Sequence, residues 1–128
     1  MTAALEAIDL VKRFGGLVAL DGVRFAAAEG EVLGIIGVNG AGKTTLMNCL
    51  CGIYRPDAGA IHLAGEDVTG RTPHEIAVRG VGRTFQVPRV FRRMSLIDNL
   101  LVPVLRKHAP DRHLIEQVEA MLERMRLI

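Results

Sequence analysis

The sequence has little of what marks a secreted, metal-binding or membrane-spanning protein. It contains only 2 cysteines, Cys49 and Cys51, and their spacing fits neither a C-x-x-C redox motif nor a zinc pair. The 4 histidines also lack metal-ligand spacing. The densest apolar run, Val32–Val38, is far shorter than the roughly 20 residues of a membrane-spanning helix. No signal peptide opens the chain, so we expect a soluble or peripheral cytoplasmic protein with free, buried or half-buried thiols.

Composition excludes a disordered chain and gives no sign of nucleic-acid binding. Hydrophobic residues make up 49% of the sequence and charged residues 23%, which is typical of a chain with its own core. The 128 residues predict about one small domain. The formal net charge of +2 is too small to indicate a nucleic-acid partner. Arginine is unevenly spread, because the segment from Arg79 to Arg93 holds five arginines and no acidic residue.

Hydrophobic patterning predicts a chain that mixes strands and helices. Apolar alternation or continuous apolar character predicts strands at 5–11, 23–26, 32–36, 60–65 and 81–85. Segment 32–36 is apolar on both faces, as in a buried central strand. Turns are expected at Gly15-Gly16 and Asp21-Gly22, and a break at 109–111. Helical spacing and caps predict helices at 44–51 (closed by Gly52), 72–80, from Ser95 until Pro103, and 114–125.

A phosphate-binding motif follows the predicted central strand. Gly37-x-x-x-x-Gly42-Lys43-Thr44 matches the Walker A pattern in full, and it stands between a strand and a helix as that motif requires. Glycines let the backbone adopt positive φ and approach phosphate oxygens. The amides from about Gly40 to Thr45 then form an anion-binding nest at a helix N-terminus. The residues expected to bind phosphate are Gly37, Asn39, Gly40, Ala41, Gly42, Lys43, Thr44 and Thr45.

Beyond this loop, the chain resembles the nucleotide-binding subunits of ABC transporters. In particular, it is similar to the ATP-binding subunits of branched-chain amino acid importers. The resemblance covers nearly the whole chain from Leu5. It is carried by 12–17, 21–23, 37–45, 51–52, 56–59, Arg83-Thr84-Phe85-Gln86, 91–95 and 99–100. One departure is Val38, which stands where the family usually has proline, but proline supplies no ligand there.

The resemblance implies a fold, a site and partners. It implies an α/β P-loop fold with an antiparallel β subdomain (1–30), a RecA-like core running to the Q-loop (31–86) and the start of a helical subdomain (87–128). Phe14 takes the position of the aromatic that stacks on adenine. Lys43 and Gln86 take the catalytic positions, and Thr44 and Gln86 those that ligate Mg²⁺. Implied partners are ATP, a second nucleotide-binding subunit, and permease subunits that bind Val87–Ser95 at the inner face of the membrane.

Family motifs that are missing leave a second hypothesis open. The Leu-Ser-Gly-Gly-Gln signature, the Walker B aspartate with its catalytic glutamate, the D-loop and the switch histidine do not occur in these residues. We therefore expect the sequence to be cut, and the 128 residues alone to be a nucleotide-binding fragment without turnover. A P-loop kinase or GTPase is disfavoured because no Asn-Lys-x-Asp guanine motif occurs.

Overall fold

The computed structural model describes residues 3–87, 89–103 and 112–127. The chain divides into two compact units, Met1–Val81 and Gly82–Ile128, and each contains its own cluster of buried apolar side chains. The predicted break at 109–111 lies outside the described residues.

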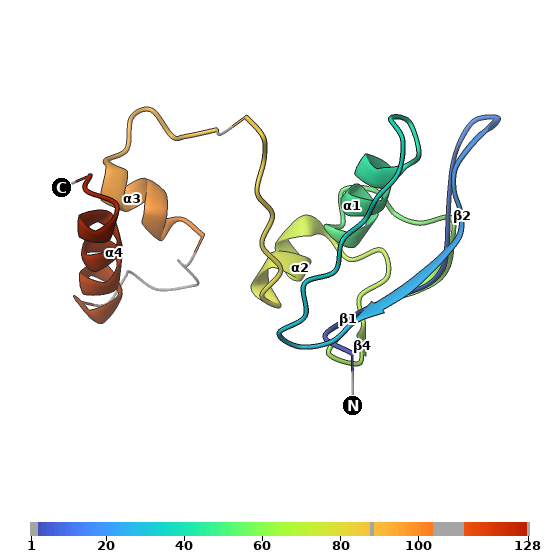
Figure 1. The fold of residues 1–128 in the computed structure, drawn as a ribbon, viewed down its shortest axis with the longest axis horizontal. Helices are drawn as coiled ribbons and strands as arrows, with labels where there is room; N and C mark the ends of the chain where they lie inside the picture. Colours follow the sequence, from blue (N-terminus) through green and yellow to red (C-terminus); the bar gives the residue numbers. More distant parts are fainter. Residues whose placement is uncertain (1–2, 88, 104–111, 128) are drawn as a thin grey trace. The chain divides into compact units, whose positions relative to one another are not determined.

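A four-stranded antiparallel sheet forms the base of the first unit (Figure 1). Its strands are β1 (Leu5–Phe14), β2 (Leu17–Ala27), β3 (Ala58–Leu63) and β4 (Glu66–Asp67), in the order β2-β1-β3-β4. The predicted strands at 5–11 and 23–26 are confirmed, and the one at 60–65 is confirmed except for its last two residues, which form a turn. As predicted, the chain reverses at Gly15-Gly16, where Phe14 pairs with Leu17.

The predicted turn at Asp21-Gly22 is wrong, because these two residues lie inside β2. Leu10 pairs with Val23 and Lys12 pairs with Leu20, so the register of the two strands shifts at Asp21-Gly22 and β2 bulges there. The glycine has a φ of 68°, a conformation that suits a bulge as well as a turn. The local sequence therefore could not distinguish a bulge from a turn.

Both helices of the first unit form as predicted, with ends within two residues of the predicted bounds. Helix α1 (Lys43–Leu50) is followed by Cys51 as C-cap and by Gly52 with a φ of 73°. Helix α2 (Pro73–Val78) begins at a capping box, in which the Thr72 N–H donates to Glu75 at 2.9 Å and the Thr72 hydroxyl accepts from the Glu75 N–H at 3.4 Å. Between sheet and α1 lies a continuous core made of Ala7, Leu10, Leu20, Leu46, Cys49, Leu50, Ile61 and Val68.

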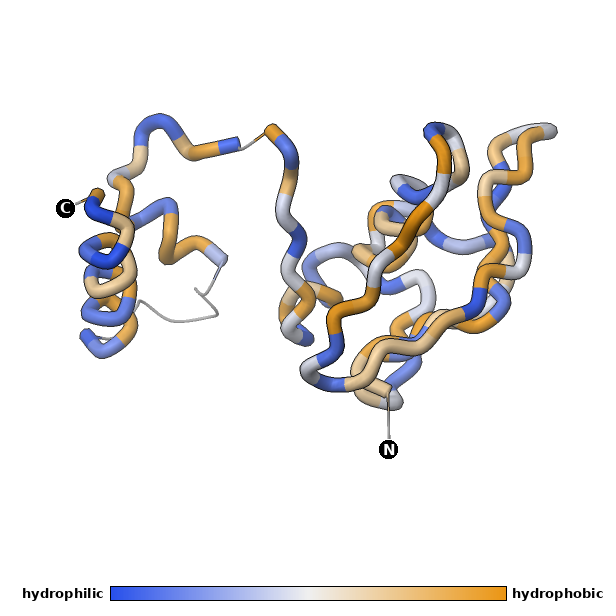
Figure 2. The backbone as a smooth tube through the Cα atoms, in the orientation of Figure 1, coloured by the Kyte–Doolittle hydropathy of each residue, from blue (hydrophilic) through white to orange (hydrophobic). Residues whose placement is uncertain are grey.

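Two predicted strands do not form. Segment 32–36 is irregular and 81–85 is irregular too, and the paired strands of the described residues are β1–β4 alone. Instead of a buried central strand, 32–36 exposes its apolar side chains, with Val32 at 97% and Ile36 at 99%. Figure 2 shows this hydrophobic stretch leading toward the loop before α1. A strand is held by its neighbours, and within the described residues no strand runs beside 32–36.

The second unit is a pair of short helices. Helix α3 (Leu96–Leu101) begins at Ser95, whose hydroxyl accepts from the Asp98 N–H at 3.0 Å, and ends before Pro103 as predicted. Helix α4 (Arg112–Arg124) packs Val118 and Leu122 against Leu101 of α3. Leu114 and Ile115 pack against this cluster, so the apolar stripe predicted at 114–125 is confirmed over most of its length. Its last member, Met125, lies after the end of α4 and is 61% exposed. Among the described residues, no helix has both the length and the apolar character that crossing a bilayer requires.

Candidate functional site

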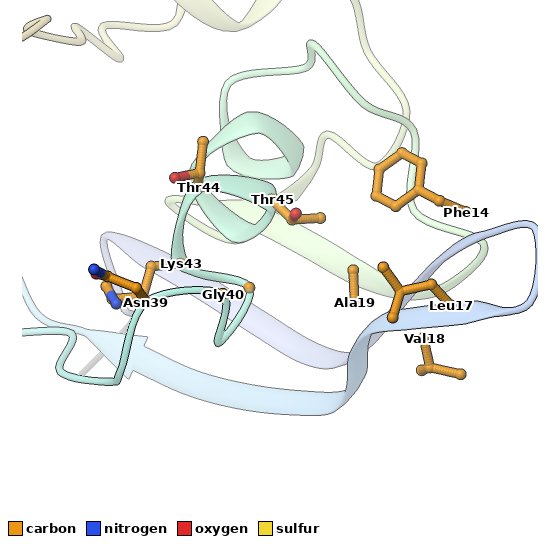
Figure 3. Close-up of a pocket in the computed structure, with 10 residues that line it drawn as sticks. Phe14, Leu17, Val18, Ala19, Asn39, Gly40, Lys43, Thr44 and Thr45 are labelled. Carbon is orange, nitrogen blue, oxygen red and sulfur yellow. The ribbon is translucent and has the colours of Figure 1, made fainter.

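A cavity of about 300 Å³ opens in the first unit where the start of α1 faces the β1–β2 hairpin. Figure 3 shows Phe14 and Leu17 on one side of it, with Asn39 and Lys43 on the other. Its lining residues are Phe14, Leu17, Val18, Ala19, Asn39, Gly40, Gly42, Lys43, Thr44 and Thr45. One wall is thus apolar and partly aromatic, and the opposite wall is a helix N-terminus.

The loop before α1 has the backbone conformation that an anion-binding nest requires. Gly40 and Gly42 both have a φ of 83°, in the left-handed region that favours glycine. The first helical hydrogen bond joins Leu46 N–H to Gly42 O at 2.8 Å, so the amides of 43–45 precede it. Gly42 has no side chain to cap those amides. The positive end of the helix dipole therefore faces the cavity through backbone N–H groups.

Gly42 also holds the loop against β2. A Cβ at this position would overlap the carbonyl oxygen of Ala19 and lie 3.2 Å from Leu20 Cδ2. A Cβ on Gly40, by contrast, would meet nothing within 4 Å. The close approach of loop and sheet thus depends on glycine at position 42, and this approach brings 17–19 to the cavity.

The Lys43 ammonium lies within its own loop. Nζ donates to the carbonyl oxygens of Gly37 at 2.5 Å and of Val38 at 2.8 Å. An ammonium carries three N–H donors, so these contacts leave one for a phosphate oxygen. The lysine therefore ties two carbonyl groups at the start of the loop to the first residue of α1.

Most of the predicted phosphate-binding residues line the cavity. Asn39, Gly40, Gly42, Lys43, Thr44 and Thr45 do so, and Phe14 lies on the opposite wall with 43% of its surface exposed. Gly37 and Ala41 belong to the loop without lining the cavity. Gly37 has a packing role, because a Cβ there would lie 3.1 Å from Ala41 Cβ.

The sequence reasoning missed Leu17, Val18 and Ala19. They lie directly after the Gly15-Gly16 turn, and the hairpin folds them back beside the strand end that carries Phe14. The turn was the available signal, since it implies that residues on both sides of it share one surface. Leu17 remains 67% exposed and Val18 42%, so this wall offers apolar surface to a ligand.

Gln86 lies in the second unit, and the cavity lies in the first. Its side chain is exposed, as are those of Val87, Arg89, Val90 and Phe91. The segment that follows is held by Asn99, whose amide accepts from Phe91 N–H at 2.8 Å and donates to Phe91 O at 3.1 Å and Ser95 O at 2.9 Å. Arg92 and Arg93 also expose their side chains on this segment.

The two thiols agree with the prediction from the sequence. Cys49 is buried and Cys51 half-buried, and both are free, as predicted. Burial raises the pKa of the Cys49 thiol, so it is protonated and unreactive near neutral pH. Within 3–87, 89–103 and 112–127, no group of three His, Cys, Asp or Glu residues could hold a metal ion.

Comparison with families and curated proteins gives consistent matches. The family model described as "ABC transporter" matches residues 20–128. The high-affinity branched-chain amino acid transport ATP-binding protein BraF of Pseudomonas aeruginosa is 49% identical over 110 residues, which are 86% of this chain and 41% of that protein. The corresponding LivG protein of Escherichia coli K12 is 48% identical over 98 residues, 77% of this chain and 38% of that protein. The chain thus spans about two fifths of the length of these relatives.

Solved structures give the same match at the level of the fold. A nucleotide-free ATP-binding cassette from an ABC transporter superposes with a TM-score of 0.79 and 32% identity over 99% of this chain and 55% of that one. The ADP conformation of MJ1267, an ATP-binding cassette of an ABC transporter, superposes with a TM-score of 0.75 and 30% identity over the same shares, 99% and 55%.

Proposed function

The chain belongs to the ABC transporter family, and we propose that its cavity binds ATP between the loop before α1 and Phe14. The observation that most supports this proposal is that three features line the same cavity. They are a loop whose glycines adopt the left-handed conformation, the N-terminus of a helix, and an exposed aromatic residue. The first two bind anions and the third stacks on a base. A nucleoside triphosphate has both parts.

Each residue of the site has a role in this proposal. The amides from Gly40 to Thr45 bind the phosphates, Lys43 adds a point charge at the β- and γ-phosphates, and Thr45 donates to the α-phosphate. Phe14 stacks on adenine, with the apolar surface of Leu17 beside it. Base stacking of this kind contributes about 1–3 kcal/mol and tolerates different bases.

We also propose that Mg²⁺ binds with the nucleotide. The hydroxyl of Thr44, a residue that lines the cavity, is a hard oxygen donor of the kind Mg²⁺ prefers. The sequence predicts the same role for the side-chain carbonyl of Gln86. Mg²⁺ bound by one or two protein groups and by substrate phosphates is common in phosphoryl-transfer sites. Such an ion supplies positive charge that neutralises the phosphates.

The relatives are longer than this chain. For a full-length protein of this kind, we propose that it hydrolyses ATP and thereby drives an importer of branched-chain amino acids. The support is that the relatives BraF and LivG are branched-chain amino acid transport ATP-binding proteins. We place this activity at the cytoplasmic face of the membrane, with a second nucleotide-binding subunit and permease subunits as partners. Segment 87–95 is the proposed permease contact, and among its described residues Phe91 and the three arginines Arg89, Arg92 and Arg93 are exposed.

The second candidate function is nucleotide binding without catalysis: the 128 residues alone would bind ATP and would not hydrolyse it. It is supported by the absence from this sequence of the signature and Walker B motifs, which orient water and complete the site in this family. Steady release of phosphate from ATP by the purified chain, lost in Lys43→Ala, would contradict it.

Nucleotide binding is tested by titration calorimetry of the chain with MgATP. Lys43→Ala should lower ATP affinity about tenfold or more, since charge-assisted contacts of this kind contribute about 1.5–3 kcal/mol. Arg112→Ala is the matched control, because it also removes one positive charge, from a side chain that is 93% exposed in the second unit. Equal effects of the two substitutions would contradict the proposed site.

The transport proposal is tested in cells. Deletion of the gene should reduce leucine uptake, and restoration with the Lys43→Ala protein should not recover it. Normal leucine uptake in the deletion strain would overturn the proposed substrate class.

A further inference from the structure

Phe14 contacts two residues to which the proposed nucleotide site gives no role. The ring of Tyr54 meets it edge to face, with centroids 5.3 Å apart and an angle of 73° between the ring planes. The Lys12 ammonium lies 5.4 Å from the centroid of the same ring. Edge-to-face pairs and cations over a ring face are both favourable contacts of the aromatic quadrupole. The orientation of the Phe14 ring is therefore specified by its neighbours.

Tyr54 is itself fixed to helix α1. The N–H groups of Ile53 and Tyr54 both donate to the Asn48 carbonyl, at 2.8 Å and 3.1 Å. The Tyr54 side chain is half-buried and packs against the core between sheet and helix. Helix α1 thus carries the phosphate loop at its N-terminal end and supports the Tyr54 ring just after its C-terminal end.

Asp57 forms hydrogen bonds with the end of β1, the strand that carries Phe14. Its carboxylate accepts from the backbone N–H of Arg13 at 2.6 Å and from Lys12 Nζ at 3.1 Å, and its own N–H donates to Val11 O at 2.8 Å. The Arg13 amide and then Lys12 lower the pKa of the Asp57 carboxyl, which therefore stays ionised. The Lys12 side chain is only 15% exposed, so its charge is held in place.

We propose that Tyr54 is a positioning residue for the nucleotide base, acting through Phe14, with Lys12 and Asp57 holding the same strand end. This inference rests on the proposed function, because it requires that Phe14 stacks on the base. Phe14 is 43% exposed at a strand end, so without these contacts its ring would lose rotational freedom on binding the base. Contacts made before the ligand arrives reduce that loss, and base affinity rises accordingly.

The test compares a ligand that has a base with one that lacks it. The chain and its variants are titrated with MgATP and with magnesium tripolyphosphate, which carries the phosphates alone. Tyr54→Leu should lower ATP affinity about two- to tenfold, as expected for the loss of one aromatic pair. It should leave tripolyphosphate affinity unchanged. Tyr54→Phe keeps the ring and should restore ATP affinity.

A double-variant measurement separates positioning from a general structural effect. In the Phe14→Leu background, Tyr54→Leu should have no further effect on ATP affinity, since its action passes through the ring that has been removed. Equal losses for ATP and tripolyphosphate in Tyr54→Leu would overturn the proposal, because Tyr54 would then support the phosphate loop.

Failure of the underlying function has a different signature. If the unaltered chain binds tripolyphosphate and ATP equally well, base stacking on Phe14 is wrong, and the role of Tyr54 fails with it. If the unaltered chain binds neither ligand, the proposed nucleotide site itself is wrong. If ATP binds better than tripolyphosphate and Tyr54→Leu keeps that advantage in full, only the positioning role fails.

Discussion

Gly40 and Gly42 offer a matched pair of substitutions in one loop. Both residues have a φ of 83°, and they differ in what a Cβ would meet. At Gly40 it would meet nothing within 4 Å, whereas at Gly42 it would overlap the Ala19 carbonyl of β2. The comparison therefore separates backbone strain from the close approach of loop and sheet.

The expected magnitudes follow from these two terms. Alanine in the left-handed region costs roughly 1–2 kcal/mol, and this is the whole expected effect of Gly40→Ala. Gly42→Ala has the same strain plus an overpacking term of roughly 1–3 kcal/mol. It should therefore lower the free energy of unfolding by about 2–5 kcal/mol. The stiffening of the unfolded chain by alanine is common to both variants and cancels in their difference.

Urea unfolding followed by tyrosine emission measures this difference. The sequence has 1 tyrosine and no tryptophan, so the emission comes from Tyr54, which lies in the same unit as the loop. The signal thus reports unfolding of the first unit rather than of the whole chain. Equal destabilisation by Gly40→Ala and Gly42→Ala would refute the reasoning, because the contact with Ala19 would then contribute nothing.

Three further predictions concern single side chains. MgATP should change the Tyr54 emission, excited where adenine absorbs little, more than tripolyphosphate does, because the base would stack on the adjoining Phe14 ring; equal changes would contradict stacking there. The Thr72 N–H, the Thr72 hydroxyl and Arg71 lower the pKa of Glu75 to about 2. Its contribution to stability should be complete above its ordinary pKa of 4.5 and lost as the pH falls toward about 2, so the unfolding free energies of the unaltered chain and Glu75→Gln should converge over that range. Asn99→Ala should speed amide exchange at Phe91, whose N–H donates to the Asn99 side chain at 2.8 Å; exchange as slow as in the unaltered chain would show that other contacts hold the segment.

Elements whose determinants are local could be predicted from sequence. The capping boxes at Thr72 and Ser95 and the glycine after α1 each depend on hydrogen bonds within a few residues. The strand predictions for 32–36 and 81–85 were wrong because a strand depends on its neighbours in the sheet. None of the described strands lies beside 32–36. Apolar character identifies residues that need covering, but it does not say which segment covers them.

The site divides in the same way. The phosphate loop is contiguous, so its residues were predicted from one motif, and most of them line the cavity. Leu17 and Val18 were missed because only the hairpin brings them to the cavity, and Tyr54 because it is 40 residues from Phe14 in the sequence. The role of Gln86 stays a prediction, since it lies in a different unit from the cavity.

A crystal structure of the chain with bound MgATP tests the central claim most directly. We predict that the triphosphate lies on the backbone amides from Gly40 to Thr45 and that the adenine stacks on Phe14, with Tyr54 still edge-on to that ring. A triphosphate in the loop with the base turned away from Phe14, or a nucleotide bound elsewhere, would contradict it.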